Sequence, residues 1–163
     1  MPSRSSTKKG FTIVEALIAS AVALIVILGV ASAFATTLTA STGTVNRIQA
    51  AFLEEEGQEA VRLMRDDSWS TNIASQSAGV PFYLTYNGTT WKATSSPTYI
   101  DGKFSRTVTL NTVNRDNSTQ DIVTSGGTLD SNTLKVTVAV SWYDHGATTS
   151  RSLQSYLTNI FSN

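Results

Sequence analysis

The sequence contains no cysteine, one histidine and only three prolines in 163 residues. Without cysteine no disulfide can form, so a folded region outside the cytoplasm would depend on its hydrophobic core alone. The same counts exclude a metal site built from cysteine and histidine. Charge is also missing from one long stretch, because no Asp, Glu, Lys or Arg lies between Glu15 and Arg47.

The chain has no excess of basic residues. Its 12 basic and 12 acidic residues balance, although Arg4, Lys8 and Lys9 lie within the first ten positions. Without those three, nine basic residues remain against twelve acidic ones, a net charge of −3. Such a balance gives no electrostatic footprint for nucleic acid. We therefore expect no nucleic-acid partner.

Residues suited to catalysis are also scarce. His145 is the only histidine and lies in an Asp-His-Gly turn. Adjacent residues on a turn do not converge as a catalytic triad requires, so His145 is interpreted as a solvated turn residue. Oxygen donors at Asp116, Asn117, Ser118 and Asp121 match no calcium loop by spacing and are read as a polar loop. We predict no enzymatic activity and no cofactor.

A long apolar run dominates the N-terminal region. Residues 16–35 are 20 uncharged residues that would span about 30 Å as a helix, the thickness of a bilayer core. Lys8 and Lys9 precede this run, which predicts a cytoplasmic N-terminus and an extracytoplasmic C-terminal part. A carboxylate such as Glu15 costs about 2.5–3.5 kcal/mol at the bilayer centre, and less near the helix start, where the helix dipole favours it.

The run begins with Lys-Lys-Gly-Phe-Thr-Ile-Val-Glu at residues 8–15. This pattern resembles the class III leader of type IV prepilins and pseudopilins. The resemblance implies that a prepilin peptidase, which is also the methyltransferase, recognises Lys8, Lys9 and Gly10 and cuts after Gly10. It also implies that Phe11 becomes the methylated N-terminus and that Glu15 pairs with the amine of a neighbouring subunit. Many family members carry a disulfide near the C-terminus, which this chain lacks.

Elementary chemistry gives Glu15 the same role. A freed α-amine has a pKa of about 7.7–8.0 and is mostly protonated at neutral pH. A second helix shifted along its axis would bring that cation beside Glu15. Pairing relieves two charges that are unfavourable in lipid and fixes the register between subunits. We therefore interpret Glu15 as a register device rather than a catalyst.

Two other interpretations of this segment stay open. An ordinary secretory signal is one, since residues 31–35 offer small residues for cleavage and a mature N-terminus near 32–37. An uncleaved signal anchor is the other, and it would tether a binding domain that never polymerises. The secretory signal would place Glu15 at the opening of its apolar region and would make the Gly-Phe-Thr-x-x-Glu match accidental, and we favour the prepilin interpretation over both.

The helix is predicted to continue to about Asp67, for a length of about 85 Å, with a softer Thr- and Ser-rich part at 36–43. Val45, Ile48 and Phe52 form one apolar stripe, which we expect to pack on a sheet rather than on a coiled-coil partner. The core stripe continues through Leu53, Gly57, Ala60, Val61 and Met64.

Charged residues occupy the opposite side of this helix. Residues 54–56 are three glutamates, read as a solvated face, with an inter-subunit salt-bridge strip as the alternative. Glu59 and Arg62 are three residues apart and are expected to pair.

From Ser70 onward the pattern becomes β. A linker at 70–79 precedes a strand at 82–86, and Asn87-Gly88 predicts a hairpin into Trp91. Further strands are expected at 104–113, at 134–143, where alternation is strict, and from 149 to about 160. Residues 114–133 are read as a loop with one short strand at 120–124.

Aromatic residues offer a second hypothesis, surface binding by the β region. Tyr83 and Tyr143 lie on strand faces opposite apolar ones and are the better candidates for exposure, whereas Trp69, Trp91 and Tyr99 fit a core equally well. Residues 53–67 and 136–157 are also similar to minor pilin V and pseudopilin I subunits, less specifically than the leader.

These observations predict an α+β fold, a long N-terminal helix packed by its second half on an antiparallel sheet. The expected organisation is a leader at 1–10, a transmembrane and assembly helix at 11–35, its exposed continuation at 36–69, and a β head at 70–163. The expected function is a structural subunit of a type IV pilus or type II secretion-like filament, anchored in the cytoplasmic membrane before assembly with other pilin or pseudopilin subunits.

Overall fold

A computed structural model of the chain describes residues 10–144 and 146–160. Lys8, Lys9 and His145, which the sequence analysis singled out, therefore lie outside the described residues. The chain divides into two compact units at the Thr44/Val45 boundary.

Helix α1 (Ile13–Asp67) begins in the first unit and ends in the second, as predicted. It is unbroken through residues 36–43, where the sequence predicts softening. Threonine hydroxyls explain this difference, because each donates to a backbone carbonyl three or four residues earlier at 2.8–3.0 Å. Their hydroxyls are thus satisfied inside the helix instead of competing with it. The threonines concerned are Thr36, Thr37, Thr39, Thr42 and Thr44.

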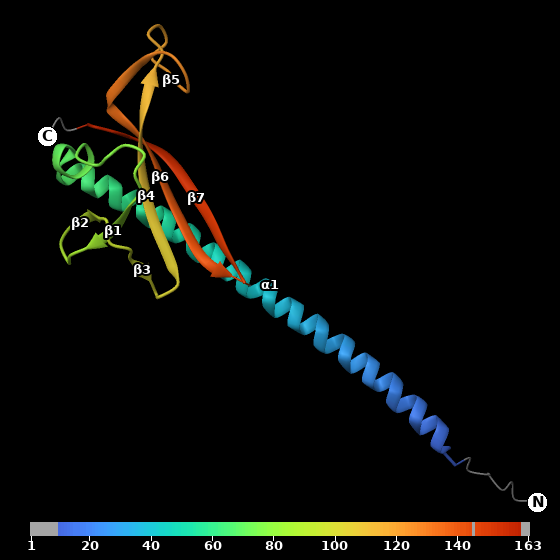
Figure 1. Ribbon diagram of the computed structural model, residues 1–163. Helices are drawn as coiled ribbons and strands as arrows, with labels where there is room; N and C mark the ends of the chain where they lie inside the picture. The colour runs from blue at the N-terminus through green and yellow to red at the C-terminus, as the bar shows by residue number, and fades with distance from the viewer. Residues whose placement is uncertain (1–9, 145, 161–163) are drawn as a thin grey trace, which may run out of the picture. The chain divides into compact units, whose positions relative to one another are not determined.

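The second unit holds an antiparallel sheet of seven strands, confirming the α+β prediction. Its main path is β2-β1-β4-β6-β7, and the short strands β3 and β5 both pair with β4. Figure 1 shows β4, β6 and β7 as long neighbouring ribbons. The strand bounds are β1 (Phe82–Tyr86), β2 (Trp91–Thr94), β3 (Tyr99–Ile100), β4 (Phe104–Arg115), β5 (Ile122–Val123), β6 (Thr128–Asp144) and β7 (Ala147–Thr158).

The predicted hairpin at Asn87-Gly88 is confirmed. Tyr86 pairs with Trp91, and the Asn87 side chain accepts the backbone N–H groups of Thr89 and Thr90 at 3.0 and 2.8 Å. Gly88 supplies the left-handed conformation of the turn, with φ of 91°. The side chain of Asn87 therefore closes the hairpin turn through two hydrogen bonds to the backbone.

Strands β4 and β6 extend further into the region 114–133 than the loop prediction allows. A register shift between Thr112 and Val113 moves the partner of Val113 to Asp130. Pairing then resumes as far as Arg115 with Thr128. The loop prediction is wrong for this part because cross-strand pairing overrides the polar composition. The predicted short strand is present as β5.

The core lies between one face of the sheet and the second half of α1, whose C-terminal turns lie against the strands in Figure 1. The short helix η1 (Trp69–Ile73) also contributes, so the interpretation of residues 70–79 as a linker is wrong for its first part. Ser68 caps η1 by accepting from the Thr71 N–H, which turns Trp69 and Ile73 inward. The main cluster contains Ala60, Val61, Met64, Trp69, Ile73, Phe82, Leu84, Val108, Leu110, Val136, Val138 and Leu157.

The first apolar stripe is not part of this core. Val45, Ile48 and Phe52 are 50%, 52% and 66% exposed, so the prediction that they pack on the sheet is wrong. The helix turns Ala50 toward the sheet instead, into a second cluster with Phe104, Val140 and Trp142. The later stripe is confirmed, because Gly57, Ala60, Val61 and Met64 are buried and Leu53 is half-buried.

The aromatic predictions have mixed outcomes. Tyr143 is confirmed as exposed, whereas Tyr83 is half-buried between its strand neighbours Thr94 and Thr107. Of the residues left open, Trp69 is buried, Trp91 is half-buried and Tyr99 is exposed.

Candidate functional site

The residues predicted for processing lie at the start of α1. Gly10 precedes the helix and is exposed, and Phe11 is 74% exposed. The bond between them is therefore sterically accessible in the isolated chain. A Cβ atom at Gly10 would contact nothing within 4 Å among the described residues.

Glu15 is held by Thr12 in a reciprocal pair of contacts. The Glu15 carboxylate accepts the backbone N–H of Thr12 at 3.2 Å and its hydroxyl at 3.0 Å. The Thr12 hydroxyl in turn accepts the Glu15 N–H at 3.3 Å. This is a capping box, which satisfies donors that a helix start leaves unpaired. Sequence reasoning missed Thr12, although the Thr-x-x-Glu spacing is the signal for such a box.

The carboxylate of Glu15 is thus satisfied inside one chain. Its contacts are to a neutral N–H and a neutral hydroxyl, so its negative charge stays uncompensated by them. A cation brought to this point would add a charge-assisted bond, roughly twice as strong as a neutral one. The box therefore holds the carboxylate at the start of α1 through contacts to neutral groups alone.

The helical segment after Glu15 has no covering in the first unit. Every large apolar side chain from Ile13 to Phe34 is more than half exposed. In the described chain, α1 is the helix long and apolar enough to cross a membrane, and none of its most apolar 18-residue window is buried. A Cβ at Gly29 would meet nothing within 4 Å. This surface has the chemistry of a segment that lipid or other helices cover.

In the second unit, ion pairs tie α1 to the sheet. Glu54 is 1% exposed and accepts from the Arg151 Nε of β7 at 2.9 Å, so the reading of residues 54–56 as a solvated face is wrong for Glu54. Burial raises the pKa of Glu54, and Arg151 only partly offsets that effect. Glu56 accepts from the buried Arg106 of β4 at 2.7 Å, while Glu55 is exposed. The predicted Glu59–Arg62 pair is confirmed.

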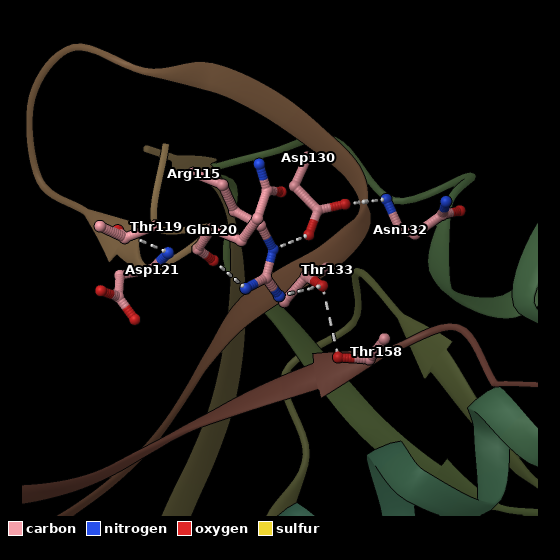
Figure 2. A network of polar contacts seen from close by, with 8 residues as sticks. All are labelled: Arg115, Thr119, Gln120, Asp121, Asp130, Asn132, Thr133 and Thr158. Atoms are coloured by element: carbon pink, nitrogen blue, oxygen red, sulfur yellow. Dashed lines mark hydrogen bonds and ion pairs between the residues drawn. The ribbon is translucent and has the colours of Figure 1, made fainter. Parts of the chain in front are cut away.

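A second polar network lies at the far end of the sheet, around Arg115. Its guanidinium donates to the Asp130 carboxylate at 2.7 Å, to the Gln120 carbonyl at 2.8 Å and to the Thr133 hydroxyl at 3.3 Å. Figure 2 shows these groups converging on Arg115, and a dashed line joins Thr133 to Thr158 of β7. The hydrogen bond from Arg115 lowers the pKa of Asp130. The network therefore fastens the segment 116–132 to β4 and β7.

Asp116 has a local role in the same segment. Its carboxylate accepts the N–H groups of Ser118 and Thr119 at 2.7 and 3.0 Å, and these bonds lower its pKa. Gly127 is required here, because a Cβ would lie 2.3 Å from the Arg115 carbonyl and its φ is 70°. No group of three Asp, Glu, His or Cys residues suited to a metal occurs within residues 10–144 and 146–160.

The comparison with protein families gives a match in the N-terminal region, where the capping box and the exposed apolar segment lie. Residues 5–31 match the model of the prokaryotic N-terminal methylation motif. No curated protein and no solved structure matches the chain. The chain thus carries a prepilin-type N-terminal motif, which is consistent with a type IV pilin-like precursor.

Proposed function

We propose that the chain is a structural subunit, a minor pilin or pseudopilin, of a type IV pilus or type II secretion-like filament. The match of residues 5–31 to the methylation motif is the observation that supports this most directly. The exposed apolar first half of α1 supports it further, because such a surface needs lipid before assembly and other helices after it.

The proposed pathway has three steps. The chain inserts in the cytoplasmic membrane with its basic leader, residues 1–10, inside and its β head, residues 70–163, outside. Prepilin peptidase, aided by Lys8 and Lys9, cuts after Gly10 and methylates Phe11. The helix 11–35 then packs among other subunits, where the cationic amine of one Phe11 meets Glu15 of its neighbour. Residues 36–69 form the exposed continuation that carries the head.

Intact-mass measurement of the mature chain tests the processing steps. We expect a chain that begins at Phe11 and carries one additional methyl group. A mature N-terminus near residues 32–37 would identify a secreted domain instead. A full-length, unmethylated chain would identify a membrane-tethered domain that never polymerises.

Substituting Glu15→Ala tests the assembly step. Insertion and cleavage should persist, since the cut lies outside the carboxylate's contacts, whereas the yield of assembled subunit should fall about tenfold or more because one amine loses its partner in lipid. Immunoblotting of sheared filaments and of membranes measures both quantities. Glu55→Ala, which removes an exposed carboxylate from the same helix, is the matched control. Wild-type levels of assembly with Glu15→Ala would contradict the proposed role.

A further inference from the structure

A groove of about 510 Å³ lies between the last turns of α1 and the β1–β2 hairpin. Glu56, Leu63 and Asp67 line it from the helix, and Tyr86 and Trp91 line it from the hairpin. All five residues belong to the second unit. We call this groove the acidic groove, since the charged residues that line it, Glu56 and Asp67, are both carboxylates.

The walls of the acidic groove suit a cation on an apolar stem. The rings of Tyr86 and Trp91 are 5.3 Å apart, and Leu63 beside them is 55% exposed. Arg106, buried beneath, pairs with Glu56 and lies 5.4 Å from the Trp91 ring. Aromatic faces and carboxylates together favour a guanidinium, which stacks on rings and pairs with acids at once.

One negative charge of this groove remains available. Arg106 compensates Glu56, but the hydrogen bond that Asp67 accepts comes from the neutral Asn72 amide at 2.8 Å. No ion pair joins Asp67 to another side chain of the described ranges 10–144 and 146–160. The groove therefore has a charge that a ligand cation would complement.

The opposite flank of the same helix carries an exposed arginine, Arg47. Glu54 and Gln58 bond to β7, the strand at the other edge of the sheet from β2. Arg47 precedes Glu54 by seven residues, or two helical turns, so it projects from the β7 flank as well. Its carbonyl accepts from Arg151, and its side chain is exposed.

Other basic residues are less well placed to reach a neighbouring groove. Lys92 and Lys135 alternate with Trp91 and Val136, so they point away from the helix-covered face of the sheet. Lys103 donates to Asn46. Among the described residues, Arg47 makes no ion pair, which leaves its guanidinium available to a partner.

We propose that the acidic groove of one subunit binds the Arg47 side chain of a second copy of this chain. The inference rests on the proposed function, because a filament needs contacts between unlike surfaces. A groove on one flank and its ligand on the other make a head-to-tail contact that extends without closing. The rise along α1 from Arg47 to Glu56 and to Asp67 places contacting copies about 13 to 30 Å apart along the helix.

Cysteine crosslinking tests this contact cleanly, because the chain has no cysteine of its own. The full chain with Ile48→Cys, which leaves the neighbouring Arg47 in place, and Leu63→Cys should give dimers and higher multimers with a short bis-maleimide in membranes and in filaments. The matched control combines Ile48→Cys with Leu129→Cys, which is 58% exposed but lies outside the groove. We expect at least about tenfold more crosslink from the first pair than from the second, in line with steered and specific contact. Equal yields from the two pairs would overturn the inference.

Charge reversal gives an independent readout. Arg47→Glu and Asp67→Arg should each lower the amount of native-like multimer, and the double variant should restore it, as expected for two charges in contact. The control double variant combines Arg47→Glu with Glu55→Arg, which reverses an exposed charge of the same helix outside the groove, and should restore nothing. Rescue by both doubles, or by neither, would overturn the inference.

The two proposals fail in different ways. Normal filaments that lack the 48–63 crosslink would refute the groove contact and leave the filament function intact. Absence of cleavage after Gly10 and of any multimer would refute the filament function, and with it the groove contact. A crosslink formed with a different membrane protein instead of a second copy also refutes the proposed occupant.

Discussion

At the scale of single residues, the proposed function gives the Glu15 side chain two partners, Thr12 before assembly and a neighbour's amine after it. In the isolated chain, Glu15 closes a capping box with Thr12. In the proposed filament, the same carboxylate pairs with a neighbour's amine. The box lowers the cost of carrying a carboxylate before assembly, because its lone pairs already accept hydrogen bonds. Its contacts are neutral, so a cation still gains from binding there.

Replacing Thr12 tests the box itself. Thr12→Val keeps the shape of the side chain but removes the hydroxyl, so the first turn of α1 should lose about 1 kcal/mol. Amide hydrogen exchange in detergent micelles should show the Glu15 N–H less protected by about fivefold. Thr12→Ser, which retains the hydroxyl, should exchange like the wild type. Unchanged protection with Thr12→Val would mean that the hydrogen bonds of the Thr12 hydroxyl do not stabilise the first turn of α1 in micelles.

At the scale of elements, the close approach of α1 to the sheet depends on Gly57. A Cβ there would lie 2.7 Å from Val138 Cγ1 and 3.0 Å from Arg106 Cδ. Glycine is otherwise unfavourable in a helix interior, by about 1 kcal/mol relative to alanine. The close packing of α1 on the sheet thus outweighs the low helix propensity of Gly57.

Gly57→Ala should therefore destabilise the second unit, because overpacking costs about 1–3 kcal/mol against a propensity gain of about 1 kcal/mol. We expect a net loss of about 1 kcal/mol and a fall in Tm of about 4 °C. Thermal unfolding followed by circular dichroism measures it. Gly29→Ala is the matched control, since its Cβ would meet nothing in the described chain and should leave that transition unchanged. An unchanged or higher Tm with Gly57→Ala would show that the side chains of Val138 and Arg106 move aside at a lower cost than these short distances indicate.

At the scale of the whole molecule, ionisable groups act on stability in opposite directions. Burial raises the pKa of Glu54 above its ordinary 4.5, so the folded state binds more protons than the unfolded state just above that pH. Hydrogen bonds lower the pKa values of Asp116 and Asp130 below 3.8, so their contributions persist above that pH and are lost as the pH falls. Of these three groups, Glu54 is the one that makes the free energy of unfolding decrease as the pH rises through the window above 4.5.

Glu54→Gln should lessen that decrease in the free energy of unfolding. Urea unfolding measured from about pH 4 to about pH 7 should show a shallower fall of the free energy of unfolding with rising pH than in the wild type. The exposed Glu55→Gln is the control and should keep the wild-type slope. A wild-type slope with Glu54→Gln would show that Arg151 compensates the buried charge fully.

The prepilin-like start, the long helix, the hairpin at Asn87 and the alternating strand ending at Trp142 could all be predicted from the sequence. Each depends on contacts between residues that are near in sequence, or on a periodicity that one element displays by itself. The Thr12–Glu15 box is equally local, and its signal was present in the sequence.

Tertiary structure alone decided which side of α1 faces the sheet, because Val45, Ile48 and Phe52 form as good a stripe as the buried one. It also decided that Glu54 is buried, since its partner Arg151 lies 97 residues away in sequence. The sequence by itself determined the membrane-type helix, its N-terminal signal and the strands, because local periodicity specifies them. The choice between two faces, and the pairing of distant charges, depend on which surfaces meet when the sheet closes on the helix.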